Sequence, residues 1–387
     1  MRSRGASDRR HIRSLAARFL LLACALSLTL AALEIALRAV GARPKSATVL
    51  STYFRHDDRT GWIGQPGAAC WFVTTDFDVF VSHDGDGFRK CGAKSSVRDD
   101  AKRAGEVVWC LGDSGTWGWG VDDGKTYVDR LNGQGGHGVV YRNLGVCGYS
   151  SVQQYLLLKK FFEQGIRPTQ VVILYCGNDL YENMDDRDQD PPRPYLVKAA
   201  SSVAPTTDER ADTSGRWELR NDPVPPARGW RVRSWLKRNL LVYNYAHFYV
   251  RSAKATLKAW RATHDAPTPS GAKSEVVASS EPTPTQQALR EIYRRIKDLC
   301  ARHEVRLAIV AEGGDEIGIC RDLGIPCANL SERWRRHFAT PGAPSISFRS
   351  DPHFNELGHK LIAEVIQREL PALRTAWDAS VPPRMMQ

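Results

Sequence analysis

The fold is decided by an apolar run that ends in a small polar turn, VVWCLGDS at residues 107–114. A short apolar run bounded by turn residues is typical of a buried strand. Three later runs have the same character, at residues 139–144, 171–175 and 307–310. Helical periodicity fills the gaps, notably at residues 155–162 and 288–299. Strands that alternate with helices predict an α/β domain with a parallel sheet covered on both faces.

Composition changes along the chain predict three parts. Residues 1–40 form a basic tail and an apolar helix, and residues 41–105 form a small β-rich lead-in of short alternating strands. Residues 106–387 form the α/β domain. The alternation of strands and helices is interrupted at about residues 181–286, where Pro-rich stretches surround an amphipathic segment. We interpret this stretch as an insertion.

The N-terminal part predicts a membrane anchor. An arginine-rich start precedes a run of Leu and Ala at residues 19–33. A bilayer span needs roughly 20 apolar residues, so Glu34 and Arg38 must lie near the far interface. The run lacks a good cleavage site, which favours an uncleaved signal anchor over a signal peptide. Arginines before the span keep the N-terminus in the cytoplasm. This predicts a single-pass protein of the inner membrane with its main domain in the periplasm.

The net charge of +11 raises the question of whether the protein binds nucleic acid or a membrane. Much of it lies before residue 20, so the folded part is only mildly basic. Nucleic-acid binding needs basic residues clustered on one face, and no nucleic-acid-binding motif follows. We therefore expect a membrane partner through the N-terminal helix and no nucleic acid.

Ser114 is the candidate nucleophile because it follows the first predicted strand, at the edge where open parallel sheets place their sites. Serine needs a base and a group that orients that base. Asp351 and His353 lie two positions apart, and residues i and i+2 of an extended chain project to the same side. Pro352 favours this extended conformation for Asp351. The pair therefore supplies the base, His353, and its orienting carboxylate.

Two further loops are candidates for an oxyanion hole, whose donors each contribute roughly 2.7 to 4 kcal/mol. Gly148 follows the second strand and can present a backbone N–H without a side chain in the way. Asn178 follows the third strand and can donate from its amide. His359 lies within a helical apolar pattern, so we assign it to structure. A serine mechanism requires no metal or cofactor, and the sequence shows no convincing cluster of metal ligands.

Nine cysteines are present, and eight remain once Cys24 is assigned to the anchor. An even number in an oxidising compartment permits disulfides. The pairs that we would test first are Cys70 with Cys91 and Cys320 with Cys327.

Gly-Asp-Ser at residues 112–114, the Asn-then-Gly loop at 143–148, Gly-Asn-Asp at 177–179 and the late Asp/His pair occur in the order of SGNH/GDSL hydrolases, and the chain resembles that superfamily. The resemblance implies a flavodoxin-like three-layer α/β/α fold. It implies that Ser114 attacks an ester carbonyl while His353, oriented by Asp351, acts as general base and then acid. The oxyanion hole would comprise the N–H groups of Ser114 and Gly148 and the Asn178 side chain.

One departure bears on the reaction. The family's Asp and His are commonly three positions apart, whereas a spacing of two is seen in related cell-envelope polysaccharide O-acetyltransferases. We expect a serine-dependent hydrolase of an acyl ester, such as an O-acetylated glycan of the cell envelope. The alternatives are an envelope polysaccharide O-acetyltransferase and a non-catalytic glycan-binding or assembly component. A trypsin-like protease is disfavoured because its serine comes late in the chain.

Overall fold

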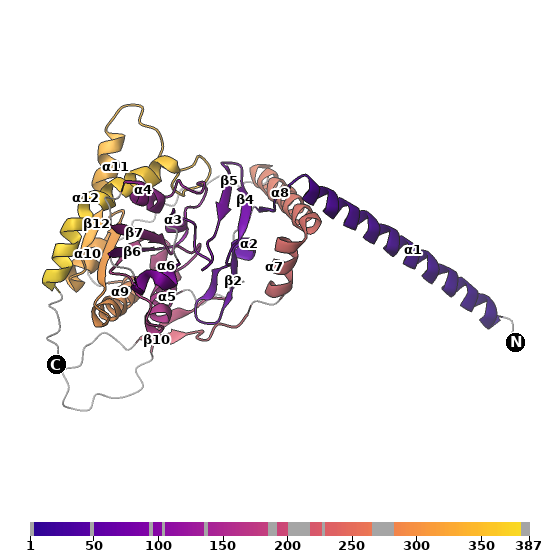
Figure 1. The fold of residues 1–387 in the computed structure, drawn as a ribbon, viewed down its shortest axis with the longest axis horizontal. Coiled ribbons are helices and arrows are strands. Elements are labelled where there is room, and N and C mark those ends of the chain that lie inside the picture. Colours follow the sequence, from indigo (N-terminus) through magenta and orange to yellow (C-terminus); the bar gives the residue numbers. More distant parts are fainter. Residues whose placement is uncertain are drawn as a thin grey trace.

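The computed structural model describes residues 4–46, 50–92, 96–102, 105–134, 138–184, 192–199, 217–226, 229–264 and 282–380. One long helix, α1 (Arg4–Ala39), projects from a folded body that contains the other elements (Figure 1).

The centre of the body is a parallel sheet in the order β12-β11-β8-β6-β7. Its strands are β6 (Glu106–Leu111), β7 (Val139–Asn143), β8 (Gln170–Leu174), β11 (Arg306–Ala311) and β12 (Cys327–Asn329). In chain order this arrangement is 2-1-3-4-5, the flavodoxin-like order. The four predicted strands are confirmed. The short edge strand β12 was not predicted, because its three residues contain no apolar run.

Side chains alternate across the sheet and divide the core into two layers. On one face, residues such as Trp109 pack against α5 (Ser151–Glu163), α9 (Pro284–Arg302) and α10 (Asp315–Leu323). On the other face, residues such as Cys110 pack against α4 (Tyr127–Gln134) and α12 (Glu356–Ser380). Because the central strands β6, β8 and β11 are buried on both sides, each of them is a continuous apolar run. The predicted flavodoxin-like α/β/α fold is confirmed.

The register of the sheet brings three loops to one edge. Cys110 of β6 pairs with Asn143 of β7, and Leu111 pairs with Ile173 of β8. The strands therefore end at nearly the same level. The chain leaves β6 for β7 on one side and returns to β8 on the other, and this switch in direction opens a crevice at the carboxyl ends of the strands. Short helices α3 (Ser114–Trp117) and α6 (Asp179–Glu182) begin there.

The lead-in contains two small sheets and lies between the central domain and helices α7 and α8 (Figure 1). Its elements are β1 (Lys45–Ser46), α2 (Leu50–Tyr53), β2 (Phe54–Asp57), β3 (Gly61–Gly64), β4 (Ala69–Val73), β5 (Asp78–Ser82) and a 3₁₀ helix (Val97–Lys102). Strands β1, β4 and β5 form one sheet, and β2 pairs with β3. Buried aromatic residues, including Tyr53 and Phe72, join the lead-in to the core beside β6.

The insertion contains an antiparallel pair, β9 (Tyr195–Lys198) and β10 (Trp217–Arg220), followed by α7 (Trp230–Asn239) and α8 (Leu241–His264). Its residues 185–191, 200–216, 227–228 and 265–281 lie outside the described residues. The single amphipathic segment expected here is divided into two helices at Leu240. These helices pack against α2, β1 and β2 of the lead-in, and α8 also contacts α1.

Residues Leu15–Ala39 of α1 are long and apolar enough to cross a membrane. The end of α1 is attached to the insertion by two polar contacts. An Nη2 of Arg38 donates to the Asn239 carbonyl at 2.7 Å, and the Val242 N–H donates to the Glu34 carboxylate at 2.9 Å. Glu34 and Arg38 also form an ion pair. The charges at the end of the apolar run therefore meet polar groups of the folded body.

All nine cysteines lie among the described residues and have free thiols. Cys70 donates to the Pro44 carbonyl and Cys91 to the Tyr141 carbonyl, so the first predicted pair is wrong. Their side chains belong to different core layers. Cys320 and Cys327 are close enough to form a hydrogen bond, which raises the pKa of Cys320. They form no disulfide either.

Candidate active site

Ser114 occupies a tight turn between β6 and α3. Gly112 has φ of +151°, and a Cβ there would meet the Thr116 hydroxyl at 2.3 Å and the Leu174 carbonyl at 2.9 Å. Only glycine fits this conformation and this close approach. Asp113 then caps α3 by accepting from the Gly115 N–H at 2.8 Å. The turn places Ser114 as the first residue of the helix, at the carboxyl edge of the sheet.

The structure brings Ser114, His353 and Asp351 together. The Ser114 Oγ lies 2.8 Å from His353 Nε2, and His353 Nδ1 lies 2.5 Å from Asp351 Oδ1. The same carboxylate oxygen accepts from the His353 backbone N–H at 2.9 Å. With Nδ1 protonated, the ring donates to Asp351 and its Nε2 can accept the serine proton. This is the arrangement expected of a nucleophile, a base and an orienting group.

Trp119 supports this pair from one side and was missed by the sequence argument. Its indole N–H donates to Asp351 Oδ2 at 2.8 Å. Its ring stacks on His353 with centroids 4.7 Å apart and planes at 17°. Partial burial would by itself raise the pKa of Asp351, but hydrogen bonds from His353 and Trp119 outweigh it, and the pKa of this carboxyl is lowered. Asp351 is thereby held as a carboxylate.

Gly148 and Asn178 line the same cleft as Ser114. In the part of the chain that the structure describes, the N–H groups of Ser114 and Gly148 have no protein acceptor. Gly148 has φ of +73°, which favours glycine. The exposed Asn178 precedes α6 without capping it, and its side chain lies beside the Glu182 carboxyl. The two N–H groups are therefore available to a ligand in the cleft, whereas the Asn178 amide is hydrogen-bonded to the Glu182 carboxyl.

The lead-in positions the Gly148 loop. The Trp62 indole N–H donates to the Cys147 carbonyl at 3.0 Å, and the Tyr149 hydroxyl donates to the Trp62 carbonyl. Gly148 is thus flanked on both sides by contacts to one tryptophan of β3. This contact between β3 and the Gly148 loop was not predicted from the sequence.

A buried arginine of the lead-in supports the other side of the nucleophile turn. Arg89 has no exposed surface and pairs with Asp123 at 2.9 Å. Its guanidinium also donates to the carbonyls of Trp117, Gly118 and Val121. It therefore supplies donors to carbonyls at the end of α3 and just after it.

The cleft beside Ser114 has a volume of about 820 Å³. Its walls combine acidic and aromatic side chains: Glu182, Glu312, Tyr175, Trp334 and Phe338. Among the described residues that line it there is no Lys or Arg. Burial raises the pKa of both Glu182 and Glu312. Glu182 also pairs with Arg193 at 2.9 Å, which offsets its negative charge beside the cleft.

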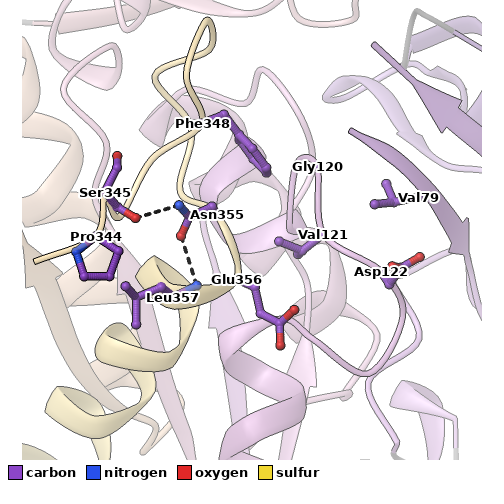
Figure 2. A pocket seen from close by; sticks show the side chains of 10 residues that line it. All are labelled: Val79, Gly120, Val121, Asp122, Pro344, Ser345, Phe348, Asn355, Glu356 and Leu357. Atoms are coloured by element: carbon purple, nitrogen blue, oxygen red, sulfur yellow. Dashed lines mark hydrogen bonds between the residues drawn. The ribbon is translucent and has the colours of Figure 1, made fainter. Parts of the chain in front are cut away.

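The loop that carries Asp351 and His353 is closed at its base by Asn355. Its Nδ2 donates to the carbonyls of Ser345 (2.8 Å) and Ser347 (3.0 Å). Its Oδ1 accepts from the N–H groups of Leu357 and Gly358, at the start of α12. Figure 2 shows Asn355 joining the two ends of the loop beside a second pocket of about 510 Å³. The loop is therefore fixed to the helix that follows it.

His359 is a structural residue, as expected. It is buried, its Nδ1 accepts from the Tyr127 N–H at 3.2 Å, and its ring stacks on the Tyr127 ring. Burial lowers its pKa to about 3, so it is neutral at ordinary pH. It takes no part in the Ser114 cluster.

The model of the GDSL-like Lipase/Acylhydrolase family matches residues 110–361, more than half of the chain. The chain belongs to this family, and it is an SGNH-type serine esterase that hydrolyses acyl esters. The predicted resemblance to SGNH/GDSL hydrolases is confirmed.

Solved structures that match the chain include the following three proteins. A lipolytic protein of the G-D-S-L family from Veillonella parvula has 11% identity, with 68% of this chain and 96% of that chain covered and a TM-score of 0.35. TesA has 10% identity, with 69% of this chain and 99% of that chain covered and a TM-score of 0.35. A variant of Axe2, an acetyl-xylooligosaccharide esterase from a Geobacillus species, has 14% identity, with 69% of this chain and 94% of that chain covered and a TM-score of 0.33. No curated protein matches the sequence.

Proposed function

We propose that this esterase removes acyl groups, such as O-acetyl groups, from a glycan of the cell envelope, with Ser114, His353 and Asp351 as catalytic residues. The observation that carries the proposal is the continuous hydrogen-bond chain from Ser114 Oγ through the His353 ring to the Asp351 carboxylate. Ser114 and His353 line a cleft that Gly148 and Asn178 also line.

In the first half of the reaction, Ser114 Oγ attacks the ester carbonyl while His353 Nε2 takes its proton. The carbonyl oxygen becomes an oxyanion, which accepts hydrogen bonds from the N–H groups of Ser114 and Gly148 and from Asn178. Asp351 stabilises the imidazolium. The ester C–O bond then breaks, and the imidazolium returns its proton to the leaving alcohol. The product is an acyl-serine.

In the second half, water enters the site that the alcohol has left. His353 takes a proton from water, and the hydroxide attacks the acyl carbonyl. The new tetrahedral intermediate collapses, the bond to Ser114 Oγ breaks, and the proton passes from His353 to the serine oxygen. The carboxylic acid leaves and the enzyme is restored.

The lining of the cleft supports an uncharged sugar ester as substrate. Carboxyl groups such as Glu312 form hydrogen bonds to hydroxyls, and aromatic rings such as Trp334 present flat apolar faces that suit the C–H faces of a sugar ring. The absence of Lys and Arg among the described lining residues disfavours substrates with phosphate or carboxylate groups near the ester.

The serine mechanism is tested by labelling the full-length protein, in detergent, with a fluorophosphonate probe. We expect covalent labelling of the wild type on Ser114, located by peptide mass spectrometry, and none in Ser114→Ala. Ser380→Ala, at the end of α12 and outside the cleft, should label normally. A wild type that does not label, and whose Ser114→Ala variant has an unchanged envelope, would support the non-catalytic binding alternative.

The substrate class is tested separately. O-acetylated oligosaccharides and lipid esters are incubated separately with the wild type and with Ser114→Ala. Mass spectrometry follows the loss of acetyl groups from the sugars and the release of fatty acids from the lipids. We expect deacetylation by the wild type alone. Rapid lipid-ester cleavage without sugar deacetylation would refute the glycan proposal while leaving the esterase mechanism intact.

Acyl transfer is the second candidate, favoured by the two-residue spacing of Asp351 and His353. In that reaction a sugar hydroxyl takes the place of water in the second half. Adding an acetyl donor and an unmodified oligosaccharide distinguishes the two reactions. A mass gain of one acetyl group on the sugar identifies a transferase, whereas free acetate alone identifies a hydrolase.

We also propose that α1 crosses the inner membrane once and places the folded body in the periplasm. The arginine-rich N-terminus and the apolar segment Leu15–Ala39 support this orientation. A C-terminal alkaline phosphatase fusion should then be active in whole cells. An inactive fusion, together with a fluorescent C-terminal green fluorescent protein fusion, would reverse the orientation.

A further inference from the structure

Helices α7 and α8 carry an exposed apolar surface that the esterase site does not use. Two exposed residues of α7, Val232 (64%) and Trp235 (54%), lie three positions apart. On α8, Ala246, Tyr249, Val250 and Ala253 are exposed and lie on one side of the helix, and the half-buried Val242 lies on the same side. Tyr249 and Val250 are 58% and 55% exposed. The opposite side, with Leu241, Asn244 and Phe248, is buried. We call the exposed set the α7–α8 surface.

This surface is inverted relative to an ordinary surface helix, which places polar residues outward. Clustered exposed apolar residues of this kind mark contact with a partner or a membrane. The buried side already packs against the lead-in. Core packing therefore does not account for the outward-facing residues.

Positive charge accompanies the apolar side chains. Neither helix contains Asp or Glu, whereas Lys and Arg are frequent in both. Arg233, Arg251 and Lys254 are exposed. Burial, together with the charges of Arg251 and Arg233, lowers the pKa of Lys237 to about 8. The local potential is therefore positive, which suits an anionic partner.

The position of the surface identifies the partner. The corner between α7 and α8 contacts Arg38 and Glu34, at the very end of the apolar segment of α1. The Tyr245 hydroxyl donates to the Arg43 carbonyl, just past α1. If α1 crosses a bilayer, this corner lies at the depth of the lipid headgroups, where Trp and Tyr are enriched. Figure 1 shows α7 and α8 on the side of the body from which α1 departs, and α11 (Ser331–Phe338) at the far end.

We infer that the α7–α8 surface docks on the anionic phospholipid bilayer that α1 crosses, as a second membrane contact. Trp235, Tyr249 and Val250 enter the headgroup region while Arg233, Arg251 and Lys254 face lipid phosphates. The insertion thereby fixes the orientation of the esterase domain relative to the membrane. This inference rests on the proposed membrane crossing by α1, but it does not depend on the reaction.

The test uses full-length protein in nanodiscs of phosphatidylglycerol and phosphatidylethanolamine. A photoreactive p-benzoylphenylalanine replaces Val232 or Tyr249, and lipid adducts are quantified by mass spectrometry after irradiation. Leu26 in α1 is the positive control position. Phe338, which is 53% exposed on α11, is the matched negative control. We expect lipid adducts at positions 26, 232 and 249, and only background at 338.

A charge variant tests the electrostatic part. Arg251→Gln/Lys254→Gln should lower adduct yield at position 232, by up to about fivefold per charge removed. Arg335→Gln/Lys360→Gln, on α11 and α12, should leave the yield unchanged. In nanodiscs of phosphatidylcholine alone, the lipid-adduct yield at position 232 of the protein without the charge substitutions should fall as it does in Arg251→Gln/Lys254→Gln.

Three results would overturn the inference. Adducts at position 26 but only background at 232 and 249 would refute docking while preserving the anchor. Adducts from 232 or 249 to a second copy of the chain or to another protein would make this surface a protein interface. Absence of adducts at 26 would refute the membrane crossing and the docking together.

Discussion

At the scale of single residues, Trp119 joins the two ionisable members of the candidate triad. Its indole N–H donates to Asp351, and its ring covers the His353 ring. A hydrogen bond to a charged group contributes about 1.5–3 kcal/mol, and 1.36 kcal/mol corresponds to a tenfold change in rate. Trp119 is therefore a positioning residue with a measurable effect.

We predict that Trp119→Phe lowers kcat/KM for a small acetyl ester about tenfold and moves the acidic limb of the pH profile to higher pH. The pKa of Asp351 is lowered in the folded enzyme, so its carboxylate persists as pH falls until that lowered pKa is reached. Loss of the indole N–H raises this pKa toward its usual value. Protonation, and loss of activity, then begin at higher pH.

The matched control is Trp71→Phe, which removes an indole from β4 that is 37% exposed and lies outside the cleft. It should change neither kcat/KM nor the profile. A Trp119→Phe enzyme with lower activity but an unshifted acidic limb would show that the indole serves only to shape the cleft.

Asn178 presents a different kind of residue-scale contribution. We predict that Asn178→Ala lowers kcat about 100- to 1000-fold with little change in KM, because an oxyanion donor acts in the transition state. Asn178→Asp, of nearly equal shape, should be at least as impaired because it removes the donor and adds a negative charge. Steady-state kinetics measure both. Normal kcat in Asn178→Ala would exclude this residue from the oxyanion hole.

At the scale of elements, Asn355 both caps α12 and closes the loop that carries the base. We predict that Asn355→Ala lowers the melting temperature by a few degrees, through loss of a cap that contributes about 1 kcal/mol, and also lowers activity. Asn355→Asp keeps the oxygen that accepts from Leu357 and Gly358 but loses the donor to Ser345 and Ser347. It should therefore melt near the wild type and yet be less active.

Thermal unfolding followed by circular dichroism, alongside initial rates, separates these two roles. If Asn355→Asp retains full activity, closure of the loop does not position His353.

How well each element could be predicted depends on whether its cause is local. Strand β6 is a continuous apolar run because it is buried on both faces, and the Asp351/His353 contact follows from i, i+2 geometry and Pro352. Strand β12 has only three residues and exists through its pairing with β11. Nothing within those residues indicates a strand.

The supporting residues of the site were missed for the same reason. Trp119 meets Asp351 across more than two hundred positions, and Arg89 reaches the turn after α3 from the loop that follows β5. Their sequence neighbourhoods are rich in glycine and aromatic residues, which indicates tight turns, but not which partners they meet. Such contacts are tertiary, and a single sequence contains no local signal for them.

At the scale of the whole molecule, the link between α1 and the body depends on a helix cap supplied by a distant residue. The Glu34 carboxylate accepts from the Val242 N–H, in the first turn of α8. A carboxylate at a helix N-terminus satisfies a free donor and opposes the positive end of the helix dipole. One side chain therefore joins the candidate membrane helix to the insertion that carries the α7–α8 surface.

We predict that Glu34→Ala frees the first turn of α8 and loosens the body from α1. In hydrogen–deuterium exchange of the full-length protein in detergent micelles, amides at the start of α8 should exchange about fivefold faster, as expected for loss of a cap of about 1 kcal/mol. Glu291→Ala, whose carboxylate pairs with Arg294 and Arg295 within α9, should leave those amides unchanged. Equal exchange in wild type and Glu34→Ala would mean that packing of α1 on α8, and not this hydrogen bond, joins the anchor to the esterase body.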